Sequence, residues 1–115
     1  MTVMIVDDHR SFRHAARRVL ESAGFEIVGE AGDGEAALEA IPRLRPDIVL
    51  LDVQMPGIDG FEVAARLIER GDPPLIVMTS SRDAADFGAL VERSGARGFI
   101  QKGDLSGPAI HAVLA

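Results

Sequence analysis

The 115-residue sequence predicts a single α/β domain whose parallel β-sheet is covered by helices on both faces. Apolar runs alternate with segments of helical periodicity five times along the chain, which is typical of repeated strand–helix units with right-handed crossovers. The apolar runs are rich in β-branched residues, as expected for strands buried on both faces. Because no linker, low-complexity tract or charge block interrupts the alternation, residues 1–115 are interpreted as one domain.

The strands and the first two helices follow from hydrophobic patterning. The first helix is indicated by apolar residues at helical spacing from Phe12 to Ala23, and Gly24 supplies its stop. The second carries apolar residues from Ala37 to Leu44 and is expected to end near Pro46. The five strands are expected at residues 2–6, 26–30, 47–52, 74–79 and 96–101.

The third helix spans Phe61 to Ile68, and Gly71 with the Pro73-Pro74 pair closes it.

The last two helical segments differ in strength. The fourth, at about residues 83–94, has only a short apolar stripe, and Gly88 interrupts it. A glycine within a helix costs about 1 kcal/mol relative to alanine, so this helix is expected to be weak. The fifth begins near Ser106 and runs to the end of the chain, with Ile110 and Val113 on one face.

Composition excludes several classes of protein. The 47% hydrophobic and 26% charged fractions are those of a soluble globular domain, and no apolar run approaches the roughly 20 residues of a membrane span. A net charge of −6 and the absence of Trp and Tyr argue against direct binding of nucleic acid. Zero cysteines exclude disulfides and fit a reducing compartment. Because the chain starts directly on a strand, no signal peptide is expected, and we predict a cytoplasmic protein without a membrane partner.

Three aspartates stand at the carboxyl ends of predicted strands. Asp7 and Asp8 follow the first apolar run, and Asp52 follows the run at residues 48–51. Ligands of open parallel sheets bind just beyond this edge, so three negative charges would converge on one pocket if the two strands are neighbours. Such charges repel strongly unless a cation joins them, and Mg²⁺ prefers carboxylate and carbonyl oxygens. The sequence therefore predicts an acidic Mg²⁺ site.

Two later strands end at the same edge. The last strand delivers Lys102, and the fourth ends in Thr79-Ser80-Ser81. A metal ion and a lysine can neutralise a phosphoryl group, while hydroxyl groups donate to its oxygens. These residue types predict a phosphoryl-transfer site in which Asp52 is the nucleophile.

Each of these features also has an ordinary explanation. Asp7-Asp8 could be a helix N-cap pair, Asp52 a turn former and Lys102 a surface residue at the sheet rim. The hydroxyl residues could simply begin a loop. The combination at one edge of the sheet favours function over these separate explanations.

The same residues resemble the receiver domain of bacterial two-component response regulators. The resemblance covers essentially the whole chain and implies a flavodoxin-like (βα)₅ fold, a doubly wound parallel sheet with strand order 2-1-3-4-5. The residues that carry it are Asp7-Asp8, Asp52 with Met55-Pro56-Gly57 and Gly60, Thr79-Ser80-Ser81, and Lys102.

The resemblance assigns roles at the acidic edge. Asp52 would accept the phosphoryl group from the phosphohistidine of a sensor histidine kinase. Asp8 and Asp52 would ligate Mg²⁺ through their side chains, Gln54 through its backbone carbonyl, and Asp7 through water. Lys102 would pair with the phosphoryl group.

The resemblance also implies a conformational switch. The family's switch hydroxyl selects Ser80, which lies 22 residues before Lys102, and its switch aromatic selects Phe99, which is expected to rotate inward from solvent. Ser81 would contribute to phosphoryl binding. Phosphorylation would then reshape the face formed by the fourth helix, the fifth strand and the fifth helix. Two further residues are expected to flank the phosphoryl group and influence its hydrolysis: Gln54 and Arg82.

Further motifs are similar to nitrate-regulator (NarL-type) receivers: Asp7-Asp8-His9 with Phe12-Arg13, and Gly98 to Lys102 leading to Leu105-Ser106-Gly107. Such receivers carry a C-terminal DNA-binding domain, so DNA is expected as a partner only through an output domain absent from this chain. A homodimer is expected on activation. The alternative is a stand-alone receiver that acts through protein–protein contacts in a phosphorelay.

Two other functions use similar chemistry. A hydrolase or phosphatase with an aspartyl nucleophile would need a cap or substrate pocket that 115 residues hardly accommodate. A pseudo-receiver, which only binds partners, is disfavoured by the intact Asp8, Asp52 and Lys102. We therefore expect no enzyme activity other than catalysis of the domain's own phosphorylation and dephosphorylation.

The three histidines are predicted to be surface residues. His9 and His14 lie five residues apart and so do not share a helical face, and His111 is remote from both in the sequence. No third ligand keeps a plausible spacing with the first two.

Overall fold

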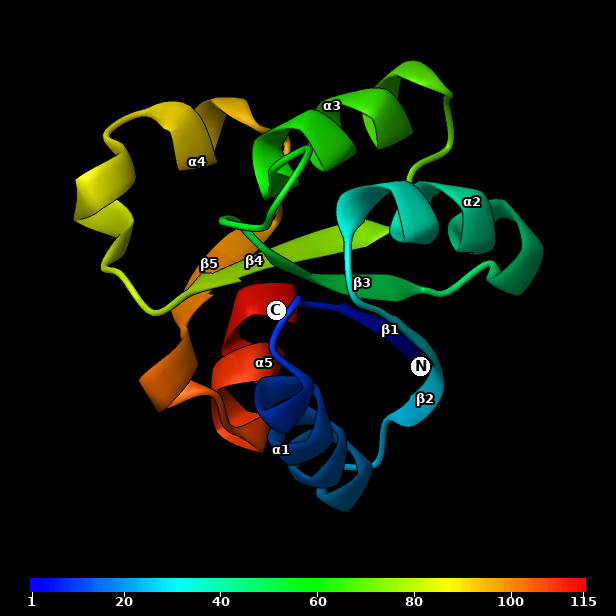
Figure 1. Cartoon of the computed structure of the whole chain (residues 1–115). Coiled ribbons are helices and arrows are strands. Elements are labelled where there is room, and N and C mark those ends of the chain that lie inside the picture. The colour runs from blue at the N-terminus through cyan, green and yellow to red at the C-terminus, as the bar shows by residue number, and fades with distance from the viewer.

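A five-stranded parallel sheet runs through the computed structural model, which describes residues 1–115 (Figure 1). Its order is β2-β1-β3-β4-β5, so the predicted fold class and strand order are confirmed. Because every pair of neighbouring strands is parallel, the carboxyl ends of all five strands meet at one edge. The strands are β1 (Thr2–Val6), β2 (Glu26–Ala31), β3 (Ile48–Asp52), β4 (Leu75–Ser80) and β5 (Gly98–Gln101).

Helices cover both faces of this sheet. In Figure 1, α1 and α5 lie on one side and α2, α3 and α4 on the other. None of the helices combines the length and the apolar character that a membrane span requires. The helices are α1 (Arg10–Ser22), α2 (Gly34–Leu44), α3 (Gly60–Glu69), α4 (Leu90–Arg93) and α5 (Gly107–Leu114).

The sheet separates two hydrophobic cores. Alternation along β1 sends Met4 and Val6 into the core beneath α2 and α3, and Val3 and Ile5 into the core beneath α1 and α5. Every residue of β3 is buried, so this strand is central and ends with Asp52 inside the protein. Burial on both faces explains why these strands have continuous apolar sequences rather than alternating ones.

Helices α2 and α3, which follow the carboxyl ends of their strands, have side-chain N-caps. Asp33 Oδ1 accepts a hydrogen bond from the Ala36 N–H at 2.7 Å, and Asp59 Oδ1 accepts one from the Glu62 N–H at 2.9 Å. Such caps satisfy backbone donors that the first turn leaves free. They set where α2 and α3 start, and hence the lengths of the loops that leave the sheet.

The fourth helix is shorter than predicted. Residues 83–94 do not form one helix: a 3₁₀ turn at Ala84–Phe87 is followed by Gly88, and α4 spans only Leu90–Arg93. Gly88 has a left-handed φ of 57°, which breaks the helical path. The leucine at the start of α4 is 53% exposed, so little apolar packing holds this segment to the sheet.

Helix α2 contains a proline that sequence analysis passed over. Pro42 has no N–H for the carbonyl of Leu38, yet α2 continues to Leu44, where Arg45 (φ 48°) ends it. The Arg70 guanidinium donates to the Leu38 carbonyl at 2.8 Å instead. A side chain from the end of α3 therefore replaces the hydrogen bond that proline removes.

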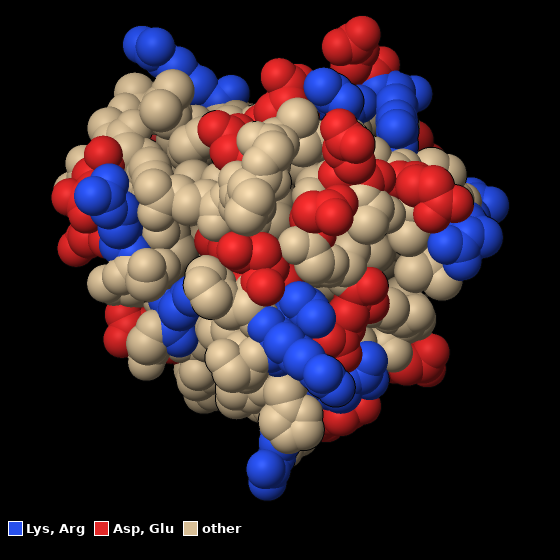
Figure 2. All heavy atoms as spheres, in the orientation of Figure 1, with Lys and Arg blue, Asp and Glu red and all other residues tan.

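Charged side chains of both signs are interspersed on the face shown in Figure 2. Arg13 and Arg17 of α1 both pair with Glu30 of β2, at 3.2 and 2.8 Å. Arg13 also donates through Nη1 to the Asp7 carbonyl at 2.6 Å. Exposed ion pairs contribute little stability, so the hydrogen bond to Asp7, which ties α1 to the loop after β1, is the more informative contact.

Candidate functional site

The carboxyl ends of three strands bring four charged side chains together. Asp7 and Asp8 follow β1, Asp52 is the last residue of β3, and Lys102 follows β5. The pairing of Val6 with Leu51 makes β1 and β3 neighbours, which places Asp7 beside Asp52. The predicted convergence of these residues at one edge is thus present in the structure.

Lys102 joins two buried carboxylates. Its Nζ lies 2.7 Å from Asp7 Oδ2 and 3.4 Å from Asp52 Oδ2, and the two aspartates are 0% and 2% exposed. The same ammonium lies 4.7 Å from the centroid of the Phe12 ring, within the range of a cation–π contact. Buried carboxylates need such compensation because burial removes their hydration. Lys102 therefore holds the edge together electrostatically.

Burial, and after it the negative charge of Asp7, raise the pKa of Asp52 to about 6. The Lys102 ammonium and the Gln54 N–H, which donates to Asp52 Oδ1 at 3.3 Å, act in the opposite direction on this pKa. At neutral pH the carboxylate is ionised but electrostatically disfavoured. A carboxylate in this state can act as a nucleophile, and an added cation would offset its negative charge.

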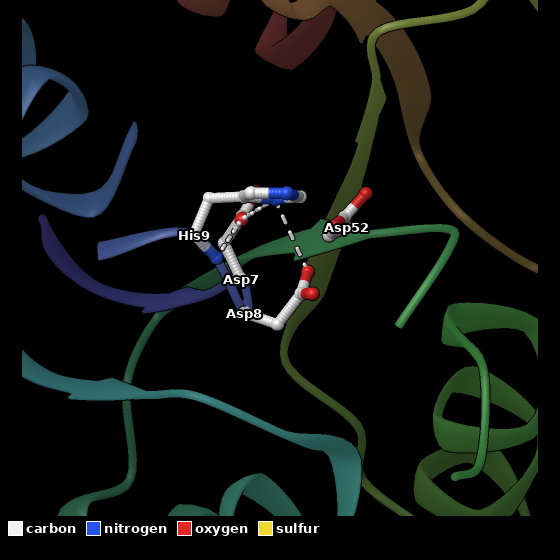
Figure 3. Close-up of side chains that lie close together, drawn as sticks. All are labelled: Asp7, Asp8, His9 and Asp52. Carbon is white, nitrogen blue, oxygen red and sulfur yellow. Dashed lines mark hydrogen bonds and ion pairs between the residues drawn. The ribbon is translucent and has the colours of Figure 1, made fainter. Parts of the chain in front are cut away.

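The His9 ring lies against this cluster, a contact that the sequence analysis did not predict (Figure 3). Its Nδ1 is 3.3 Å from Asp7 Oδ1 and 3.3 Å from Asp8 Oδ1. The side chain is 66% exposed, so the expectation of a surface position holds, as it does for the exposed His14 and His111. Sequence reasoning tested only helical spacing between histidines. The missed signal was the position of His9 directly after the aspartate pair.

The donor set fits a hard divalent cation. Ligand atoms of Asp7, Asp8, His9 and Asp52 all lie within 4.8 Å of one another. Asp8 Oδ1 is buried and accepts no hydrogen bond, and Asp7 Oδ2 has only its ion pair with Lys102. Carboxylate oxygens lacking donors at one point are what Mg²⁺ and similar ions bind.

The loop after β3 keeps helix α3 in close contact with the site. The Gly60 N–H donates to the Val53 carbonyl at 2.8 Å, and Met55 is buried in the core beneath α2 and α3. A Cβ atom on Gly60 would overlap the Asp52 carbonyl oxygen and would lie 2.9 Å from the Val53 Cα. Glycine is therefore required here by close backbone approach rather than by a special φ.

The hydroxyl residues at the end of β4 differ in environment. Ser80 is buried, and its Oγ accepts a hydrogen bond from the Arg82 N–H at 3.0 Å, whereas Ser81 and Arg82 are exposed. Thr79 is paired in register with Asp52, is 1% exposed, and its Oγ1 has no hydrogen-bond partner. Sequence reasoning favoured Ser80 by spacing and did not anticipate this unpaired hydroxyl.

Phe99 is already half-buried, although a solvent-facing ring was expected. It packs against the core beneath α2 and α3. Its ring centroid lies 6.2 Å from that of Phe87, which in turn lies 5.8 Å from that of Phe61. Phe87 ends the 3₁₀ turn before Gly88, so this chain of rings connects β5 to the irregular segment before α4.

A groove of about 560 Å³ lies at the opposite edge of the sheet. It is bounded by Asp47, Arg70 and Leu75, which stand near the amino ends of β3 and β4 or the end of α3. The charged cluster, at the carboxyl ends of the strands, therefore lies outside this groove.

The family model described as the response regulator receiver domain matches residues 3–113. The transcriptional regulatory protein NarL of Mycobacterium tuberculosis is 39% identical over 113 residues, which cover 97% of this chain and 52% of that protein. The positive alginate biosynthesis regulatory protein of Pseudomonas aeruginosa is 42% identical over 104 residues, covering 89% and 41%. The chain thus spans about half or less of the length of these relatives.

Solved structures show the same similarity. The signal receiver domain of NarL from Mycobacterium tuberculosis has a TM-score of 0.86 and 34% identity, covering 99% of this chain and 96% of that one. A chain of the CheX-CheY-BeF₃-Mg²⁺ complex from Borrelia burgdorferi has a TM-score of 0.87 and 28% identity, covering 99% and 86%.

Proposed function

Because the chain belongs to the response regulator receiver domain family and is similar to NarL-type members of it, we propose that Asp52 is the phosphoacceptor of a two-component signalling pathway. The donor in this proposal is the phosphohistidine of a sensor histidine kinase. The observation that carries the proposal is the buried Asp52 carboxylate, which lies 3.4 Å from Lys102 Nζ and beside Asp7.

The transfer proposed for Asp52 exchanges one bond at phosphorus for another. A carboxylate oxygen attacks the phosphorus atom, the P–O bond forms, the P–N bond to the donor imidazole breaks, and that imidazole regains a proton from solvent. Lys102 then pairs with the phosphoryl oxygens. Its ammonium already contacts two carboxylates at this position, so it is placed to pair with a negatively charged group on Asp52.

Mg²⁺ is the proposed cofactor of this site. Asp8 and Asp52 would hold the ion through side chains, Gln54 through its carbonyl and Asp7 through water. The ion would supply neutralisation of the negative charge on the transferring group. The buried Oδ1 atom of Asp8, which accepts no hydrogen bond, supports this assignment.

Catalysis is proposed to be limited to the domain's own phosphorylation and dephosphorylation. The methylesterase/glutaminase of Hahella chejuensis shares 40% identity with this chain, but the match covers only 25% of that enzyme. We therefore do not infer esterase activity for this chain. We assign residues 1–115 as one receiver domain. The exposed Gln54 and Arg82 are proposed to influence phosphoaspartate lifetime.

The output is proposed to be transcriptional. Several relatives are named as transcriptional regulators, and the chain covers about half of each. We propose that the α4–β5–α5 face controls a DNA-binding domain, that activation favours a homodimer, and that the protein works in the cytoplasm. The alternative remains a stand-alone receiver acting through protein–protein contacts in a phosphorelay.

Acetyl phosphate tests this function directly. With Mg²⁺ present, the intact protein is expected to gain one phosphoryl group by mass spectrometry, and peptide mapping should place it on Asp52. Excess EDTA should prevent the gain because the acidic cluster would then repel the donor. A modification that forms equally with EDTA, or that maps to another residue, would contradict the proposal.

The two neighbouring aspartates are expected to contribute unequally to Mg²⁺ affinity. Asp8→Ala should weaken binding more than Asp7→Ala, because Asp8 Oδ1 faces only the His9 ring at 3.3 Å while Asp7 Oδ2 is paired with the Lys102 ammonium at 2.7 Å. We expect a loss of about tenfold or more for Asp8→Ala, the usual scale for metal-site residues. Calorimetric titration measures both, and a larger loss in Asp7→Ala would reverse the assignment.

The proposed switch connects Ser80 to Phe99. Met78 and Ser80 are two residues apart on β4 and therefore lie on the same face of the sheet. Met78 is paired in register with Phe99 on β5. A phosphoryl group on Asp52 would offer acceptor oxygens to the Ser80 hydroxyl, which now accepts from the Arg82 N–H. Movement of Ser80 would change the packing of Phe99 and then Phe87, at the weakly packed segment before α4.

Ser80→Ala is expected to uncouple phosphorylation from this rearrangement. Beryllofluoride, a phosphoryl mimic, should shift the amide NMR signals of residues 84–101 and increase self-association by light scattering in wild type. Ser80→Ala should retain the mimic but lose most of both responses. Thr79→Val is the matched control. If Thr79→Val shows neither the NMR shifts nor the self-association while Ser80→Ala shows both, Thr79 rather than Ser80 carries the switch hydroxyl.

A further inference from the structure

We propose that His9 shifts the cation preference of the acidic site, by adding a nitrogen ligand that strengthens the binding of Zn²⁺ relative to that of Mg²⁺. The inference rests on the cation site of the proposed function. It adds a nitrogen ligand, His9 Nδ1, that this function does not require.

The placement of the ring supports a ligand role. Nδ1 is equidistant, at 3.3 Å, from one oxygen of Asp7 and one of Asp8, so it faces the point where the two carboxylates meet (Figure 3). The Asp52 carboxylate completes a set of four ligand atoms that all lie within 4.8 Å of one another. A cation reached by these carboxylates is therefore also within reach of the imidazole after small adjustments.

The two oxygens of Asp7 face different partners. Oδ2 pairs with Lys102, whereas Oδ1 faces His9 Nδ1 and accepts the His9 N–H at 2.8 Å. That backbone hydrogen bond fixes His9 at the N-cap of α1, with extended dihedral angles of −93° and 107°. Lys102 and His9 thus lie on opposite oxygens of one carboxylate, and a cation on the His9 side does not have to displace the lysine.

The chemistry of the ligands sets the direction of the preference. Mg²⁺ demands oxygen ligands and releases its water reluctantly, so an imidazole adds little to its binding. Neutral imidazole suits Zn²⁺, whereas Mn²⁺ shares with Mg²⁺ a preference for carboxylate and carbonyl oxygens. When the neutral ring binds a cation through Nδ1, its proton resides on the other nitrogen. His9 should therefore strengthen the binding of Zn²⁺ more than that of Mn²⁺, while leaving that of Mg²⁺ nearly unchanged.

Calorimetry with each of the three cations tests this selectivity in the intact chain. His9→Phe keeps a planar ring without nitrogen, and His14→Phe is the matched control on an exposed residue of the same helix. At mildly alkaline pH, we expect His9→Phe to lose about tenfold in affinity for Zn²⁺, to lose less for Mn²⁺ and to stay within about twofold for Mg²⁺. His14→Phe should match wild type for all three.

Ring ¹⁵N NMR provides a second measurement that needs no variant. Zn²⁺ should shift the Nδ1 signal of His9 and leave the signals of His14 and His111 in place, and a Mg²⁺ titration should move none of them. Equal cation ratios in His9→Phe and wild type, or an unmoved His9 signal at saturating Zn²⁺, would overturn the inference while the acidic site stands. If Asp52→Asn binds every cation as wild type does, the cation site of the proposed function fails as well.

Discussion

Asp52→Asn is expected to have two opposite effects: it abolishes phosphorylation by acetyl phosphate, and it stabilises the metal-free domain at neutral pH. The first follows because an amide offers no nucleophilic carboxylate oxygen at this position. The second follows because the carboxylate is 2% exposed and lies beside Asp7, so its charge is unfavourable in the folded protein. Loss of the Lys102 contact reduces the gain only in part, because that ammonium keeps its 2.7 Å partner Asp7.

The raised pKa determines the pH dependence of this stabilisation. The pKa of Asp52 is about 6 in the folded protein against a reference of 3.8, so the folded state holds more protons than the unfolded state between these values. The free energy of unfolding therefore falls as pH rises through this window. Above about pH 6 the Asp52 carboxyl is ionised in the folded protein, and the stability that its protonation provides at lower pH is fully lost. In that range we expect Asp52→Asn to be more stable than wild type by about 1–3 kcal/mol.

Urea unfolding in EDTA, at a pH below the window and a pH above it, measures the difference. Asp104→Asn removes the same charge from an exposed position and should change stability little at either pH. A stabilisation of Asp52→Asn that persists unchanged at the lower pH would show that burial of the charge is not its cause. Any phosphoryl group gained by Asp52→Asn would show that another residue accepts it.

Gly60→Ala is expected to destabilise the domain strongly and to disturb the phosphorylation site. The new Cβ would overlap the Asp52 carbonyl oxygen and would lie 2.9 Å from the Val53 Cα, and both are backbone atoms that cannot rotate away. Overpacking of this kind typically costs about 1–3 kcal/mol, and we expect the upper part of that range or more. Relief requires that α3 move away from the end of β3, which would displace Asp52 and slow phosphorylation.

Gly103→Ala is the matched control for this variant. Gly103 lies near the same edge, directly after Lys102, but a Cβ there would meet no atom within 4 Å, and its φ is not left-handed. Chemical denaturation of both variants, together with their rates of phosphorylation by acetyl phosphate, provides the comparison. A Gly60→Ala protein as stable as Gly103→Ala would mean that α3 and β3 are not held as closely as the structure indicates.

The strands and the acidic edge could be predicted from the sequence because their signals are local. Continuous apolar runs identify strands buried on both faces, and Asp7, Asp8, Asp52 and Lys102 each stand at the end of such a run. In a parallel sheet this position alone brings them to one edge. The strand order 2-1-3-4-5 came from the family resemblance, since periodicity does not specify which strands pair.

Contacts that depend on side-chain direction were decided only by the tertiary structure. His9 is at the surface, as predicted, but only the structure shows that the turn after β1 directs its ring onto Asp7 and Asp8. Phe99 is half-buried because the ring of Phe87, from the turn before α4, packs beside it. Spacing in the sequence identifies the strand that carries a residue, whereas its exposure, rotamer and hydrogen-bond partners depend on distant elements that pack against that strand.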